Sequence, residues 1–146
     1  MHELATARTG PANRYLAYGT MLPPLAIESP MIELDWFHYN CPTSWPAYRD
    51  AGTHRVPAVV HCAWRYGDAA AVVLVNVDSV EHSVRVPANA ETLRLPRRGG
   101  YTVQRILGGE PTEPEPLTDS GSVSLALPPR RVVLLEITPT NPIHRV

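Results

Sequence analysis

One run of small and β-branched residues constrains the fold of this chain more than any other, AAAVVLVNVD at positions 69–78. Side chains alternate across an extended strand, so Val73 and Val75 share one face. Val72 and Leu74 line the opposite face. β-Branched residues at this density favour a strand over a helix. A strand that is apolar on both faces is typical of the centre of a fold, where both faces are covered.

Shorter alternating segments surround this run and are separated by Gly- and Pro-rich turns. Strands are expected at 31–37, 58–66, 69–78, 80–86, 93–95, 101–107, 122–127 and 131–138. A parallel sheet would need helical crossovers, and the turns between these segments are too short to hold them. The sequence therefore predicts an all-β fold, an antiparallel β-sandwich of about seven to eight strands with a short N-terminal helix.

Three parts of the chain follow from this pattern. Positions 1–28 form the N-terminal helix and a Pro-rich connector, 29–138 form the β-sandwich domain, and 139–146 form a C-terminal tail. Gly19 is expected to end the helix in the left-handed C′ conformation. A short helix in front of a β domain has little to pack on, which favours a contact with something upstream.

Two local predictions concern the first half of the chain. The segment 31–37 is expected to be an edge strand, and the aromatic-rich segment 38–56 is expected to be a long loop that is functional or covers another surface. In the strand at 58–66, Val60, Cys62 and Trp64 are expected to share the apolar face.

Composition excludes several classes of protein. The hydrophobic fraction of 44% is typical of a globular domain, and the net charge of −1 with no clustered basic face gives no support for nucleic-acid binding. No apolar run reaches the roughly 20 residues that a membrane helix needs. No signal peptide is recognisable, so the localisation is unknown, with the cytoplasm as the default expectation. Cys41 and Cys62 are expected to be free thiols, although one disulfide between them stays open.

No catalytic, metal or cofactor motif stands out. The six histidines show no metal-ligand spacing, and neither a phosphate-binding loop nor a nucleophile elbow is present. Glu33 and Asp35 are expected on the solvent face of one strand, and Glu113 and Glu115 in a solvated Pro-rich loop. We therefore predict no catalytic residue, no metal ligand and no cofactor.

Aromatic residues cluster in the first half of the chain and are the most suggestive group. Trp36, Tyr39, Trp45 and Tyr48 are candidate carbohydrate-binding residues, because flat aromatic faces can stack on sugar rings. The alternative is that they fill a core or an inter-domain contact, as large aromatic side chains commonly do.

Four segments carry a resemblance to a known class of domain. They are RYLAYGTMLPP at 14–24, VPAVVHCAWR at 56–65, VLVNV at 73–77 and LPPRRVVLLEI at 127–137. Together they resemble the C-terminal β-sandwich that follows a catalytic (β/α)8 barrel in bacterial glycoside hydrolases, with the closest likeness to a poorly characterised barrel family. The resemblance implies that the catalytic carboxylates lie on the barrel, outside this chain.

The function expected from this resemblance is that of a non-catalytic accessory domain of a carbohydrate-active enzyme. It would pack against and stabilise a catalytic barrel in cis or in trans, with carbohydrate as a second partner. The first alternative is an independent carbohydrate-binding module. The second is a small hydrolase that uses carboxylates or histidines of the segment 38–56.

Overall fold

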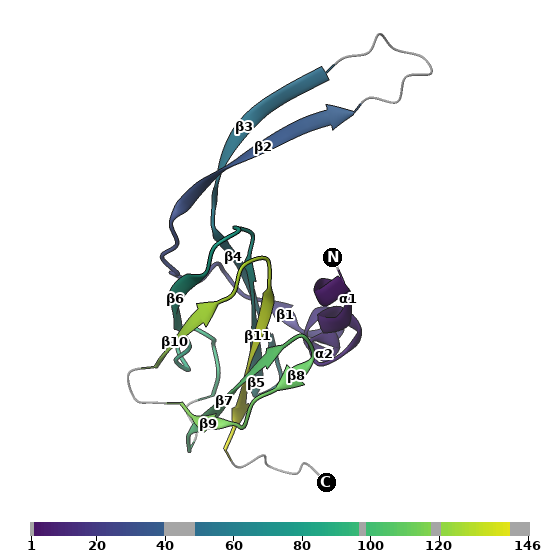
Figure 1. Cartoon of the computed structure of the whole chain (residues 1–146). Helices are drawn as coiled ribbons and strands as arrows, with labels where there is room; N and C mark the ends of the chain where they lie inside the picture. The colour runs from purple at the N-terminus through teal and green to yellow at the C-terminus, as the bar shows by residue number, and fades with distance from the viewer. Residues whose placement is uncertain (1, 40–48, 97–98, 118–120, 141–146) are drawn as a thin grey trace.

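The computed structural model describes residues 2–39, 49–96, 99–117 and 121–140 (Figure 1). Two short helices precede the strands, α1 (His2–Thr9) and α2 (Asn13–Tyr18). The strands of the described residues are β1 (Thr20–Met21), β2 (Met31–Tyr39), β3 (Arg49–Pro57), β4 (Val59–Tyr66), β5 (Ala69–Asn76), β6 (His82–Pro87), β7 (Tyr101–Leu107), β8 (Glu110–Pro111), β9 (Glu115–Pro116), β10 (Ser122–Leu127) and β11 (Val132–Pro139). The predicted all-β, antiparallel architecture is confirmed, with two short N-terminal helices in place of one.

The main sheet has seven strands in the order β1-β4-β5-β11-β7-β8, and β9 also pairs with β7. The run of valines predicted to lie at the centre forms β5, with β4 on one side and β11 on the other. Val72 pairs with Leu135, and Leu74 pairs with Val133. Cross-strand pairs of branched side chains of this kind are the unit of sheet stabilisation. The centre of the fold is therefore the place that the sequence pattern indicated.

The second layer is the two-stranded antiparallel sheet of β6 and β10, which covers one face of the main sheet. Their alternating apolar residues, such as Val86 and Leu127, are fully buried against β5 and β11. The connector after β1 closes the same core with Leu22 and Leu25. Burial of each such side chain stabilises the fold by roughly 1.5–3 kcal/mol.

The opposite face of the main sheet is covered in part by the two helices. Tyr15 of α2 is fully buried against Leu134 and Ile106, and Ala12 completes this second cluster. The sequence showed no surface on which this helix could pack. In the structure it packs on the main sheet. Its burial explains why a six-residue helix, too short to be stable alone, forms here.

The end of α2 differs from the prediction. Gly19 adopts an extended conformation, with φ −79° and ψ 163°, and is not in the left-handed region. Its N–H donates to the Tyr15 carbonyl oxygen at 2.8 Å, and a Cβ at this position would collide with that carbonyl. Glycine is required by this close backbone approach and not by a positive φ.

Val60, Cys62 and Trp64 share one face of β4 as predicted, but the opposite face packs into the main core. Val59 and Ala63 are buried in the main core, whereas Val60 is 44% exposed and Cys62 and Trp64 lie half-buried on the outer face. Both faces of β4 carry apolar residues, so alternation alone did not distinguish them. The strand expected at 93–95 is a turn, in which Arg94 has a positive φ of 51°.

The segment 38–56, expected to be a loop, holds the end of β2 and almost all of β3. The sequence of β3, RDAGTHRVP, has few apolar residues because this strand does not cover the core. Its strand character comes from its pairing with β2 instead. The expected edge strand at 31–37 is accordingly half of a long hairpin.

Candidate functional site

The hairpin of β2 and β3, which we call the arm, is the most distinctive feature of the structure. Its strands pair in antiparallel register from Met31–Pro57 to Tyr39–Arg49, and Figure 1 shows them extending away from the two packed layers. The base is fixed by two bonds. The Ala58 N–H donates to the Pro30 carbonyl oxygen at 2.8 Å, and the Val59 N–H donates to Ser29 Oγ at 2.9 Å.

The two faces of the arm differ in character. One face carries the pair Ile32–Val56 and then Leu34, all half-buried. The other face pairs Glu33 with Arg55, both exposed. Glu33 and Asp35 were predicted on a solvent face, and both are exposed there. The arm is therefore amphipathic, although it stands outside the sandwich.

The apolar face of the arm belongs to neither hydrophobic cluster of the described residues. Ile32, Leu34 and Val56 are absent from the core between the two sheets and from the cluster under the helices. An isolated two-stranded hairpin is only marginally stable in water, and a hydrophobic face needs a covering surface. This half-buried apolar face therefore lies outside both core clusters of the described residues.

Two of the four aromatic residues predicted to bind carbohydrate, Trp36 and Tyr39, belong to the distal half of β2. Trp36 pairs with Gly52 and Tyr39 with Arg49 in the backbone register of β2 and β3. Trp45 and Tyr48 lie outside the described residues, as does Cys41. Of the predicted group, the structure therefore places the backbone of two members on the arm.

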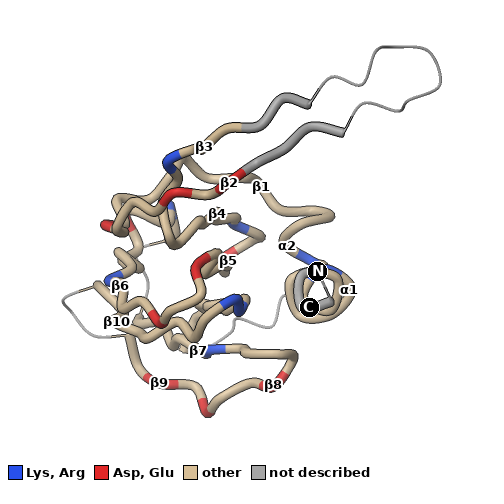
Figure 2. Tube along the Cα trace, turned by 45° about the horizontal axis from the view of Figure 1, so that its top comes forward, with Lys and Arg blue, Asp and Glu red and all other residues tan. Residues whose placement is uncertain are grey.

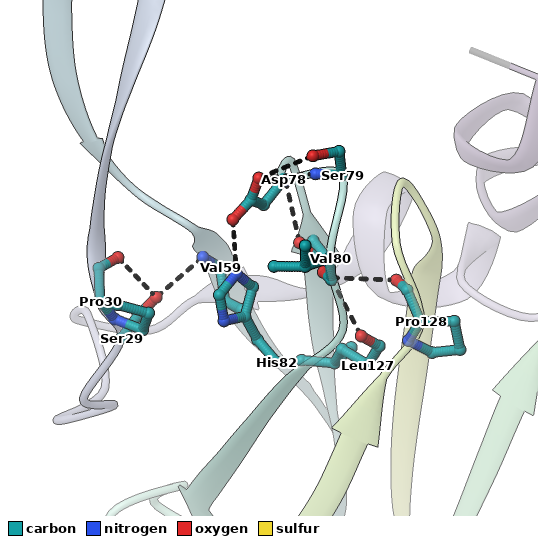
Figure 3. Close-up of polar contacts among 10 residues, drawn as sticks. Ser29, Pro30, Val59, Asp78, Ser79, Val80, His82, Leu127 and Pro128 are labelled. Carbon is teal, nitrogen blue, oxygen red and sulfur yellow. Dashed lines mark hydrogen bonds and ion pairs between the residues drawn. The ribbon is translucent and has the colours of Figure 1, made fainter.

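A buried asparagine fixes the connection between β5 and β6 (Figure 3). Asn76 is 1% exposed, and its Nδ2 donates to the carbonyl oxygens of Val80 at 2.8 Å, Leu127 at 3.0 Å and Pro128 at 3.1 Å. Its Oδ1 accepts from the Asp78 N–H at 2.9 Å. A buried side chain whose polar atoms are all bonded to backbone in this way is a structural element, and its geometry joins the two sheets.

The same loop contains an ion pair between a histidine and a carboxylate. His82 Nε2 lies 2.7 Å from Asp78 Oδ2, and their side chains are 15% and 20% exposed. The hydrogen bond from His82 is the main reason why the pKa of Asp78 lies below its ordinary value of 3.8, with a further contribution from the Ser79 N–H. Such a pair resembles part of a catalytic triad, but the neighbouring hydroxyl of Ser79 donates to Asp78 Oδ1 at 3.4 Å and not to His82.

A pH dependence of stability follows from this shift. A carboxyl group whose pKa is lowered by folding stabilises the protein above its unfolded pKa, and this contribution is lost as the pH falls through the folded pKa. Acid titration should therefore lower the free energy of unfolding as the pH drops below about 3.8, measured by urea denaturation at a series of pH values. In the Asp78→Asn variant this part of the pH dependence should be missing. An unchanged acid limb in the variant would contradict the assignment.

The remaining predicted groups have structural roles or stand alone. His61 Nε2 accepts the Leu25 N–H at 3.2 Å, which ties the connector to β4. Cys62 is a free, half-buried thiol, and Glu113 and Glu115 are exposed as expected. Within the described ranges no three metal-ligating side chains gather, and no helix is long and apolar enough to cross a bilayer.

Charge on the described residues is mostly dispersed. In Figure 2 most acidic and basic residues of the described chain stand singly along the trace, but the segment of β8 and β9 carries three acidic residues in a row, Glu110, Glu113 and Glu115. On the arm, Glu33 pairs with Arg55, so opposite charges lie side by side there.

Sequence reasoning missed β3 and thus the arm. The signal that was present is the opposite charge of Glu33 and Arg55 together with the apolar residues Ile32 and Val56 at matching positions of a hairpin. Cross-strand pairs of this kind stabilise antiparallel strands. β2 and β3 are separated by nine residues of sequence, so the matching positions of the two strands were not recognised.

Comparisons with known proteins return similarities among solved structures and none elsewhere. No protein-family profile and no curated protein matches the chain. Among solved structures, a GH30 endoxylanase from Clostridium papyrosolvens C71 shares 16% sequence identity with a TM-score of 0.43, over 64% of this chain and 24% of that enzyme. The chain thus spans about a quarter of the length of the enzyme that it resembles in part.

Proposed function

We propose that this chain is a non-catalytic accessory β-sandwich domain of a carbohydrate-active enzyme, and that its arm packs against the catalytic (β/α)8 barrel of that enzyme. The observation that carries the proposal is the apolar face of the arm, formed by the half-buried Ile32, Leu34 and Val56, which belongs to neither core cluster of the described residues. Apolar side chains on a projecting hairpin are expected to be covered by a second folded unit.

The size of the apolar face is sufficient for a specific contact but not for a large one. Full burial of one Ile or Leu side chain contributes roughly 1.5–3 kcal/mol. Ile32, Leu34 and Val56 are already half-buried, so each contributes only part of this amount to the roughly 8 kcal/mol of a micromolar contact. The arm therefore suits a domain contact in cis, or a moderate complex in trans.

The identity of the covering unit rests on the resemblance of the segments 14–24, 56–65 and 127–137 to sandwich domains that follow a barrel. Glycoside hydrolysis normally uses two carboxyl groups that flank the scissile bond. In this proposal the two carboxyl groups belong to the barrel.

The proposal is tested on the arm. The double variant Ile32→Ser/Leu34→Ser should weaken binding to the barrel encoded in the same or a neighbouring reading frame by at least about tenfold, because it removes most of the buried apolar area. Isothermal titration of the purified chain with the barrel measures this affinity. The matched control is Glu33→Ser/Asp35→Ser, which changes the opposite face of the same strand and should leave the affinity nearly unchanged.

Two results would reject this function. Equal barrel affinities for the two double variants would show that the apolar face of the arm is not the contact. Hydrolysis of a glycoside by the purified chain alone would make it an enzyme in its own right.

The alternative function, an independent carbohydrate-binding module, is distinguished by the tryptophans. If Trp36, Tyr39, Trp45 and Tyr48 stack on sugar rings, soluble polysaccharides should change the Trp fluorescence of the isolated chain in a saturable way. Under the accessory-domain proposal the fluorescence changes on addition of the barrel and is indifferent to glycans.

A further inference from the structure

The small sheet of β6 and β10 has an open edge along β6. The Ala88 N–H donates to the Gly121 carbonyl oxygen at 2.7 Å, which makes this a hydrogen-bonded pair next to the pair Pro87–Ser122. Hydrogen-bonded and non-hydrogen-bonded pairs alternate along an antiparallel ladder. The backbone N–H and C=O groups of Ser83 and Arg85 therefore point away from β10, towards the free side of β6.

A groove of about 490 Å³ runs along this edge. Its lining consists of Ser83, Val84, Arg85 and Pro87 of β6, Ser122 at the start of β10, and Ala26 and Glu28 of the connector. Within the described ranges, no hydrogen bond joins the backbone of Ser83 or Arg85 to the connector. The groove thus lies beside two residues whose backbone donors and acceptors are unpaired.

A hydrogen bond fixes the orientation of Arg85, one of the polar side chains that line the groove. Arg85 Nε donates to Ser122 Oγ at 2.9 Å, which fixes the guanidinium over the sheet, while its terminal nitrogens make no bond within the described part of the chain. Pro87 has no N–H, so the edge offers donors only at Ser83 and Arg85. Glu28 and Arg85 are the two charged residues that line the groove.

We propose that this groove binds an extended peptide segment of a partner protein, which adds to the edge of β6 as a third strand. Backbone bonds at Ser83 and Arg85 would supply affinity, as in other cases of strand addition. A residue opposite Arg85 on the added strand places its side chain on the same face, so an acidic residue there meets the free nitrogens of the guanidinium. The site lies on the sandwich and does not depend on the arm or on the proposed barrel.

The test uses the whole chain and a defined probe. A set of synthetic peptides of about six residues, with alternating Thr and Val and one Glu at each position in turn, covers the usual strand length and register. Amide chemical shifts and hydrogen exchange are followed for the chain during titration. We expect saturable shifts and slowed exchange at the Ser83 and Arg85 amides, lost when alternate peptide nitrogens are methylated.

Two variants locate the site on the edge. Ser83→Pro removes one of the two edge donors and should weaken binding at least about tenfold; Pro87 shows that the edge accommodates proline. The matched control is Ala126→Pro, at an exposed position of β10 whose N–H faces the opposite edge, and it should bind normally. Arg85→Glu should reverse the preference from Glu-containing to Lys-containing peptides.

The inference would be overturned by the absence of any protection at these amides at millimolar peptide, or by N-methylated peptides that bind as well as the parent set. Shifts at the groove on addition of a neutral xylo-oligosaccharide but not of peptide would also reject it and assign the groove to sugar. Should Ser83→Pro fail to fold by circular dichroism, the methylated peptides decide the question alone. None of these outcomes bears on the barrel contact, which the arm variants test separately.

Discussion

The Asn76→Ala variant should lose about 3–5 kcal/mol of unfolding free energy, among the largest effects of any single substitution in this chain. The amide of Asn76 bonds three carbonyl oxygens and one N–H, and alanine removes all four bonds, of which one is buried and three are partly buried. An unpaired buried polar group costs about 1–3 kcal/mol, so the losses accumulate even if water reaches some of them. Urea denaturation measures the change, and the melting temperature should fall by roughly 10 °C.

A second asparagine provides the control. Asn89 Oδ1 accepts one bond, from the Thr92 N–H at 2.8 Å, and its side chain is only partly buried. Asn89→Ala should therefore cost about 1 kcal/mol. If the two variants were equally stable, the network around Asn76 would not join the two sheets as described.

The second large effect is expected at Tyr15, which is fully buried between α2 and the main sheet. Tyr15→Ala should cost up to about 3–5 kcal/mol, the range for removing a large aromatic side chain from a core. The loss is limited by the free energy of releasing the helices, because the main core on the other face of the sheet does not contain this residue. Hydrogen exchange should show fast-exchanging α2 amides in a chain whose β5 and β11 amides stay protected.

The hydroxyl of Tyr15 separates packing from hydrogen bonding. It donates to Glu136 Oε1 at 3.0 Å, and Arg14 Nη2 lies 2.6 Å from the same oxygen. Burial, reinforced by the charge of Glu136, raises the pKa of Tyr15 far above its ordinary value, so the phenol stays protonated and keeps donating. Tyr15→Phe should cost only about 1 kcal/mol. Equal losses for the Phe and Ala variants would show that the polar cluster, not the ring, holds the helix.

The parts of the fold that the sequence predicted are the strands whose apolar pattern reflects how their faces are covered. β5 and β11 read as continuous apolar runs because they lie at the centre, and β10 alternates because one of its faces is exposed. The pattern of β4 did not show which of its faces packs into the main core, because the helix side of the sheet also takes the apolar Trp64. Periodicity shows that a strand has two different faces but does not say what covers each.

The arm could not be predicted from periodicity for a related reason. Its strands lie outside the core, so β3 was under no requirement to alternate, and Gly52 and His54 interrupt its pattern. The aromatic residues Trp36 and Tyr39 were recognised as unusual, but their common placement on one hairpin depends on the pairing of β2 with β3. The open edge of β6 was equally hidden, because it depends on which strand lies beside it and not on its own residues.

The base of the arm has a consequence for how this domain can change. Pro30 and Ala58 are joined by a hydrogen bond of 2.8 Å, so the chain leaves the sandwich and returns to it at nearly the same point. The central strands do not require the segment between these two residues for their own pairing. Lengthening, shortening or replacing this segment would change the surface that the domain presents to a partner and leave the main sheet intact.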